Sequence, residues 1–275
     1  MYFNSYQWAA CLLLSLVAIN AEASLTPYTS YGRSLVYSSV SNTSWVADGN
    51  LLGSMMNSQG HDTVVDAILT ASPFVDTYRL SAYDFSSSNF DGRTTWFGAV
   101  AFTHYLNSIN YGGSNRWRLP TVTDTGSPGC DFSYGGTDCG YNPDTNTGEM
   151  AQLYYDELGK KAYRDVNGAG PQSGFNILGS GTTADTTGSP TPFDNVHTKA
   201  YWSATKYYVN GYAWFFSTNF GTQDGGGLKS TPMYVWAVSP GQVSAVPIPV
   251  SVLLFGSGLL GLLGLARRGR FGKPG

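Results

Sequence analysis

The fold of this chain is decided near its end by the stretch KAYWSATKYYVNGYAWFFSTNFGTQDGGGLKSTPMYVWAV, residues 199–238. Three segments within it, residues 199–203, 212–217 and 234–238, alternate large apolar residues with small or polar ones. Alternation of this kind predicts half-buried β-strands. Turn-type residues at 219–227 separate the last two segments. The end of the domain is therefore predicted to be a small antiparallel sheet.

Two helices are predicted upstream of this sheet. Residues 95–109 place apolar side chains on one helical face. The second helix spans residues 148–159, where Asn146 and Glu149 resemble a capping box at the start. Gly159 fits the C-terminal end of that helix.

The N-terminal part of the domain carries weaker patterns. Residues 35–37 and 43–46 predict a short opening hairpin. Residues 51–89 are weakly patterned and are predicted to be an insertion or a long excursion. Residues 24–244 are therefore expected to form one α+β domain, with two helices and short antiparallel strands.

The first 23 residues have the pattern of a secretion signal. An apolar run at residues 8–19 is followed by Ala21-Glu-Ala23, which fits a small-residue cleavage site before Ser24. We therefore expect residues 1–23 to be removed on export.

The C-terminal tail, residues 246–270, holds an uncharged apolar stretch followed at once by Arg267 and Arg268. At about 1.5 Å per residue, this stretch is just long enough to cross a hydrocarbon core of roughly 30 Å as one transmembrane helix. Arginines that flank a span stay on the cytoplasmic side, so the preceding domain should lie outside. A buried core helix is the alternative, but such helices are usually amphipathic.

Composition agrees with export and excludes one class of partner. The chain has a net charge of −3, and only 12% of its residues are charged. Four of its basic residues follow the apolar tail, so the domain itself is more acidic still. A basic footprint for nucleic acid is therefore not expected.

Cysteine usage also fits an exported protein. Cys11 lies in the secretion signal, which leaves Cys130 and Cys139 in a glycine-rich loop. We expect these two residues to form a disulfide. A metal site is the alternative, but it needs more ligands than this loop offers.

A set of motifs follows in order along the domain: Asp91-Gly-Arg93, Trp117-Arg-Leu-Pro-Thr121, Glu149-Met150, Tyr201-Trp-Ser-Ala-Thr205 and Tyr234-Val-Trp-Ala-Val238. Over residues 35–241 this arrangement resembles the Lcl C-terminal domain family, long described as a domain of unknown function. The resemblance implies a C-type-lectin-like fold, akin to the scaffold of the formylglycine-generating enzyme. Residues 52–90 depart from the family's usual spacing.

The tail has a resemblance of its own. Val246, Pro247, Ile248 and Pro249, followed by the apolar span and the two arginines, resemble a PEP-CTERM sorting signal of the Val-Pro-Leu-Pro-Ala type. That resemblance implies an exosortase-type processing enzyme as partner, transient residence in the inner membrane and release to the cell surface or extracellular matrix of a Gram-negative bacterium. A permanent single-span anchor is the alternative, and only the proline motif separates the two.

Metal and catalytic signals are sparse. Asp144, Asn146 and Glu149 place oxygen ligands as a weak calcium site would, and Asp165 and Asn167 show similar spacing. Turn formation explains these residues equally well. No catalytic residue is assigned, because the three histidines are scattered and nucleophile motifs are missing. No cofactor other than calcium is expected.

Aromatic residues give the remaining indication of a binding site. The tryptophans of the motif segments are predicted to be core, with sugar stacking as the alternative: Trp117, Trp202, Trp214 and Trp236. Loop residues are better placed to face a ligand. These candidates are Tyr134, Tyr141, Tyr207, Tyr208 and Asp224.

Taken together, these features predict an exported, non-enzymatic surface or matrix protein that binds extracellular polysaccharide. One alternative is a secreted glycan-active enzyme, which would need two carboxyl groups converging in a cleft. The other is a membrane-tethered adhesin or receptor, which would present an exposed apolar patch to a protein partner.

Overall fold

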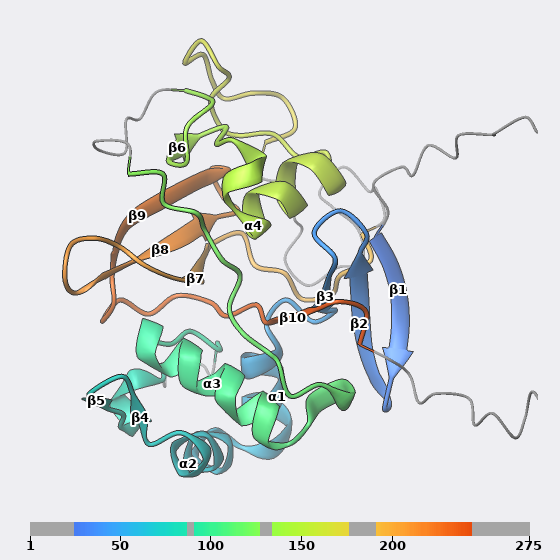
Figure 1. Ribbon diagram of the computed structural model, residues 1–275, viewed down its shortest axis with the longest axis vertical. Coiled ribbons are helices and arrows are strands. Elements are labelled where there is room, and N and C mark those ends of the chain that lie inside the picture. Colours follow the sequence, from blue (N-terminus) through green and yellow to red (C-terminus); the bar gives the residue numbers. More distant parts are fainter. Residues whose placement is uncertain (1–24, 87–90, 127–133, 176–190, 244–275) are drawn as a thin grey trace, which may run out of the picture.

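The computed structural model describes residues 25–86, 91–126, 134–175 and 191–243, and they form an α+β fold with antiparallel sheets (Figure 1). Among these residues, no helix is long and apolar enough to cross a membrane. The predicted secretion signal, with Ala21, Ala23 and Ser24, and the predicted tail span at 246–270 lie outside the described residues.

The first sheet joins the two ends of the domain. Its strand order is β1-β2-β3-β10, and all neighbours are antiparallel. The strands are β1 (Leu25–Ser30), β2 (Arg33–Ser38), β3 (Thr43–Val46) and β10 (Val238–Pro240). The hairpin predicted from residues 35–37 and 43–46 is confirmed by β2 and β3. Figure 1 shows the late strand β10 lying beside the early β3.

The second sheet has the order β6-β9-β8-β7. Its strands are β6 (Gly140–Tyr141), β9 (Thr222–Leu228), β8 (Tyr212–Ser217) and β7 (Ala200–Lys206). The strands predicted at 199–203 and 212–217 are confirmed. The strand predicted at 234–238 is only partly right, because Tyr234 makes a single parallel bridge to Tyr201 and regular pairing begins at Val238.

The prediction of turn structure at 219–227 holds only for residues 219–221, because residues 222–227 belong to strand β9. Its glycines are explained by packing. A Cβ at position 225 would lie 2.1 Å from the Tyr207 ring, and one at position 227 would lie 2.7 Å from the Trp202 ring. The strand therefore uses glycine to let bulky rings lie directly on its backbone.

Both predicted helices are present. Helix α3 (Trp96–Ser108) starts at Thr95, whose hydroxyl accepts from the Gly98 N–H. Helix α4 (Glu149–Gln152) continues as a π-helical turn (Leu153–Glu157) and ends before Gly159, whose φ is 61°. The predicted capping box at Asn146 and Glu149 is wrong, because the N-cap is Gly148 and the Glu149 carboxylate accepts from Arg118 instead.

The expectation of only two helices is also wrong. The weakly patterned segment folds into α1 (Leu51–Gln59) and α2 (His61–Ala71), then β4 (Phe74–Val75) and β5 (Tyr78–Arg79). Both helices are short and only Gly60 separates them, so the sequence of neither shows a long periodic pattern. Their buried residues pack beside α3 in one cluster: Leu52, Met55, Met56, Val64, Val65 and Ile68. Single 3-10 turns occur at Ala82–Asp84, Tyr111–Gly113 and Thr145–Thr147.

The tryptophans of the motif segments lie in the core, as predicted. Trp117, Trp202, Trp214 and Trp236 are each no more than 2% exposed. Trp202 packs with the α1–α3 cluster, while Trp236 lies in a second cluster with Trp45. The sugar-stacking alternative for these four rings is therefore excluded by their burial.

Candidate ligand-binding site

A polar pocket of about 150 Å³ lies where residues 121–123 pass the start of α4. We call it the threonine pocket, and it is lined by Thr121, Thr123, Thr145, Asn146, Thr147, Gly148, Glu149 and Gln152. The lining includes four threonine hydroxyls and two side-chain amides. The hydroxyls of Thr121 and Thr147 and the amide of Asn146 already donate to acceptors within the chain. Of the site residues predicted from the sequence, Asn146 and Glu149 line this pocket, as does Thr121 at the end of the Trp117–Thr121 motif.

Backbone bonds fix the two walls of this pocket. Thr123 N–H donates to Thr147 O at 2.6 Å, and Glu149 N–H donates to Thr121 O at 3.1 Å. The side-chain amide of Gln223, on β9, donates to Asp138 O and to the Thr147 hydroxyl. A Cβ at Gly148 would lie 2.0 Å from the Gln223 amide oxygen, so glycine is required for this contact.

Glu149 is fully engaged by the chain itself. Its two oxygens accept from the Arg118 guanidinium at 2.6 and 2.8 Å, and one also accepts from the Thr121 N–H and hydroxyl. Desolvation by burial raises the pKa of Glu149, but the bonds from Arg118 and Thr121 outweigh it and leave that pKa below its ordinary value. Glu149 is therefore a charged acceptor and a poor proton donor.

The calcium candidates show turn chemistry. Asp144 accepts from the Asn146 N–H at 3.0 Å and from its amide at 2.9 Å, while Asp165 accepts from the Asn167 N–H at 2.9 Å. These are local side-chain turns. Within the described ranges, no group of three His, Cys, Asp or Glu residues is placed to hold a metal ion. Calcium at Asp144, Asn146 and Glu149 remains a prediction that the contacts do not favour.

Three of the predicted ligand-facing residues come together. The rings of Tyr207 and Tyr208 have centroids 4.4 Å apart, and Tyr208 is 74% exposed. Tyr207 also meets Trp214 edge-on at 5.6 Å. Desolvation, the hydrogen bond with Tyr208 and the charges of Asp124 and Asp224 raise the pKa of Tyr207 to about 12. We call Tyr207 and Tyr208 the tyrosine pair, and the Tyr207 hydroxyl stays protonated at neutral pH.

Asp224 was expected in a loop but lies on β9, opposite Phe215 of β8. Its carboxylate accepts from the Gly226 N–H at 2.6 Å. Desolvation raises the pKa of Asp224, and this backbone bond opposes the rise. Asp224 therefore acts on the tyrosine pair through its charge.

The tyrosine pair and the threonine pocket share one extended segment, residues 121–125. Thr121 and Thr123 line the pocket, while Val122 packs with Trp214 and Tyr207. The Thr205 hydroxyl bonds both the N–H and the C=O of Val122, which ties this segment to β7. The two features therefore lie on opposite sides of a single strand-like segment.

Tyr134 and Tyr141 form a separate aromatic group. Their centroids are 6.0 Å apart, and the Arg164 guanidinium lies 5.8 Å from the centroid of Tyr134. Tyr134 rests on Gly168, where a Cβ would lie 2.6 Å from the ring. Within the described residues, no ring contact joins this group to the tyrosine pair.

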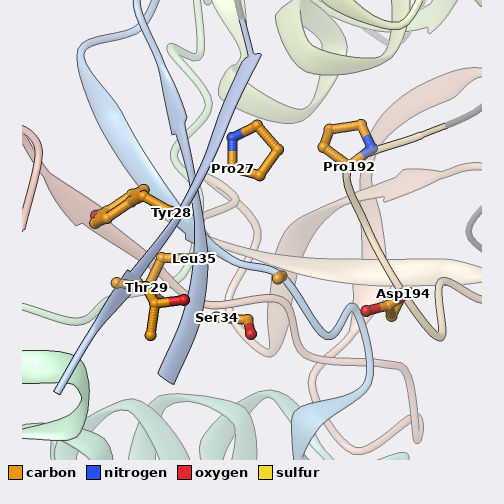
Figure 2. Close-up of a pocket in the computed structure, with 8 residues that line it drawn as sticks. Pro27, Tyr28, Thr29, Ser34, Leu35, Pro192 and Asp194 are labelled. Carbon is orange, nitrogen blue, oxygen red and sulfur yellow. The ribbon is translucent and has the colours of Figure 1, made fainter. Parts of the chain in front are cut away.

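A second pocket, of about 300 Å³, was not predicted. It lies between β1, β2 and the loop at 192–194 (Figure 2). Its lining is Pro27, Tyr28, Thr29, Ser34, Leu35, Ala47, Pro192 and Asp194. The pocket joins segments more than 150 positions apart, and no local sequence pattern marks such a juxtaposition.

A buried polar cluster around His197 was also missed. The Asn50 amide donates to Asp91 O at 2.9 Å and to His197 Nε2 at 3.2 Å. The His197 ring stacks on Tyr234 with centroids 4.4 Å apart. Desolvation lowers the pKa of His197, and the charges of Asp91 and Asp48 oppose that change. Because Asn50 also caps α1 through the Gly53 N–H, this cluster holds the insertion onto the domain.

The remaining predicted sites fall wholly or partly outside the described residues. Cys139 is buried, but Cys130 lies outside them, so the Cys130–Cys139 disulfide stays a prediction. The sorting residues Val246, Pro247, Ile248, Pro249, Arg267 and Arg268 also lie outside.

Comparison with known proteins finds no matching family model, no matching curated protein and no matching solved structure. The function is therefore inferred from the chemistry of these sites.

Proposed function

We propose that the protein is an exported, non-enzymatic surface or matrix protein that binds extracellular polysaccharide. The threonine pocket is the observation that carries this proposal. Hydroxyl and amide groups each donate and accept hydrogen bonds, as the hydroxyls of a sugar require. The proposal includes a C-type-lectin-like fold for the domain and processing of the tail by an exosortase-type enzyme.

The size of the threonine pocket favours binding of one sugar unit of a polymer. At about 150 Å³ it is smaller than the roughly 300–1,000 Å³ of sites that enclose a drug-sized ligand. Tyr207 packs against Val122 of the 121–125 segment, and the exposed ring of Tyr208 lies beside Tyr207. An aromatic ring with a polar tip suits contact with a sugar face, so the tyrosine pair can hold a further unit of the same chain.

Binding is favoured over glycan hydrolysis by the carboxylates. Glycoside hydrolysis generally uses two carboxyl groups roughly 5–10 Å apart, one of which donates a proton. The threonine pocket has one carboxylate, and Arg118 keeps it charged. The pocket of Figure 2 also has one, from Asp194.

The experiment is carried out in the native host. Thr123→Ala and Gln152→Ala are combined, and partition of the protein between matrix and medium is compared with that of the wild type. Thr70→Ala, an exposed threonine on α2, is the control. We expect wild type and control to stay with the matrix and the double variant to shift to the medium. Unchanged retention of the double variant would contradict the proposal.

Processing of the tail has its own measurement. We expect the intact mass of the surface or matrix protein to correspond to a chain that starts at Ser24 and ends near Pro249. A membrane-bound species that retains Arg267 and Arg268 would instead identify a permanent anchor and a tethered adhesin or receptor.

A further inference from the structure

The pocket of Figure 2 combines apolar walls with polar groups that are not used by the fold. Figure 2 shows Pro27 of β1 facing Pro192 of the neighbouring loop, and these two prolines supply the apolar surface. Its volume of about 300 Å³ reaches the lower end of the range for small-ligand sites. The pocket is separate from the threonine pocket, with which it shares no lining residue.

The acidic group of this pocket is held by a rigid backbone. Asp194 N–H donates to Ala47 O, and Gly49 N–H donates to Asp194 O, both at 2.8 Å. Asp194 and Asp48 thereby form a parallel bridge between two loops. The backbone of Asp194 is fully used, whereas its side chain is exposed and makes no ion pair with any described residue.

The charges around the pocket are negative. Asp48, which follows Ala47 of the pocket lining, has a carboxylate that accepts from the Asn50 N–H and the Asn195 amide. The nearest basic residue in sequence, Arg33, has its guanidinium 5.1 Å from the Tyr111 ring centroid. Arg33 does not line the pocket, although its neighbours Ser34 and Leu35 do. A cation in the pocket would therefore meet the Asp194 carboxylate, and no lysine or arginine is among the described residues that line the pocket.

We propose that this pocket binds the ammonium group of an amino sugar, so that the polysaccharide recognised by the protein carries free amines. The inference rests on the proposed polysaccharide function and specifies the chemistry of the polymer. The Asp194 carboxylate pairs with the ammonium, Thr29 and Ser34 offer hydroxyls to the sugar, and Pro27 and Pro192 cover its apolar face. The net charge of the chain, −3, also favours a cationic polymer over an acidic one.

The test measures binding of the full-length protein to three oligosaccharides: a glucosamine oligomer, its fully N-acetylated counterpart and a neutral glucose oligomer. The glucosamine oligomer should bind about tenfold or more tightly than the other two, since a charge-assisted bond is lost in each of them. This preference should weaken in high salt.

Three variants test whether the preference for glucosamine arises in this pocket. Asp194→Asn keeps the shape of the side chain and should remove the preference for glucosamine, and Ser34→Ala should reduce it. Asp66→Asn, on the exposed face of α2, changes the net charge equally and should leave the preference intact. Binding of the neutral oligomer should be the same in all three variants.

Four results would overturn the inference. One is equal loss of glucosamine binding in Asp194→Asn and Asp66→Asn, which would mean that only net charge matters. Another is binding of a lysine-rich peptide to a protein that binds no amino sugar, which would assign the pocket to a protein partner. If Asp194→Asn has no effect while Thr123→Ala with Gln152→Ala weakens neutral binding, the inference fails and the proposed function stands. If no oligosaccharide binds, both fail.

Discussion

Arg118 and Glu149, 31 positions apart, form a two-pronged ion pair in which the guanidinium donates at 2.6 and 2.8 Å to the two carboxylate oxygens. Their side chains are only 33% and 16% exposed. The pair joins the segment entering the threonine pocket to the first turn of α4. It therefore holds the two walls of the pocket together.

Removing the charge of Glu149 should destabilise the domain. Glu149→Gln leaves the Arg118 guanidinium half-buried without its partner, and we expect a loss of about 1–3 kcal/mol in the free energy of unfolding. Urea denaturation measures this loss. Asp156→Asn, an exposed change on the same helical segment, is the control and should alter stability little.

The same carboxylate should make stability depend on acidic pH. Its folded pKa is below its ordinary value of 4.5. The unfolded chain therefore binds the proton first on acidification, so the contribution of Glu149 is present above pH 4.5 and is lost as pH falls through the folded pKa. Urea midpoints across this range should fall more steeply for the wild type than for Glu149→Gln. Parallel curves would contradict this assignment.

The glycines of β9 should differ sharply in how well they tolerate substitution by alanine. A Cβ at position 227 would lie 2.7 Å from the Trp202 ring and 2.9 Å from Ala213 O, whereas one at position 226 would meet only Asp224 Oδ1 at 3.1 Å. Gly227→Ala should therefore cost about 1–3 kcal/mol by overpacking, with Gly226→Ala much milder. Thermal unfolding of both variants measures the difference, and equal melting temperatures would show that the Trp202 contact is easily relieved.

His197 should titrate below the ordinary histidine pKa of about 6.5, because burial disfavours its charged form. The charge of Asp91 raises this pKa, so Asp91→Asn should lower it further. The ring-proton shift of His197 followed by NMR gives both midpoints. A midpoint at or above 6.5 would mean that the ring is more hydrated than its contacts with Asn50 and Tyr234 imply.

Strong periodic patterns allowed part of the fold to be predicted. Strands β7 and β8 alternate clearly, α3 has a continuous apolar face, and the four motif tryptophans are large enough to require burial. Strand β9 was missed because its glycines resemble a turn, and their purpose depends on Trp202 of β7 and on Tyr207, which directly follows that strand. Helices α1 and α2 were missed because each is short and its apolar face is completed only by α3.

The candidate site was predictable only in fragments. Tyr207, Tyr208 and Asp224 were expected to face a ligand and do come together, although Asp224 lies on a strand. Asn146 and Glu149 were noted as oxygen ligands, but the partner that redirects Glu149 is Arg118, 31 positions away. Pairings between distant segments also create the pocket of Figure 2, and no spacing within one segment reveals them.

The most direct test is a titration of the purified protein with the extracellular polysaccharide of its own host. We predict saturable binding by the wild type and by Thr70→Ala. Binding by Thr123→Ala combined with Gln152→Ala should be weaker by about tenfold or more, as expected for two lost hydrogen bonds. Wild-type binding that is absent, or that the double variant matches, would contradict the claim that the threonine pocket binds polysaccharide.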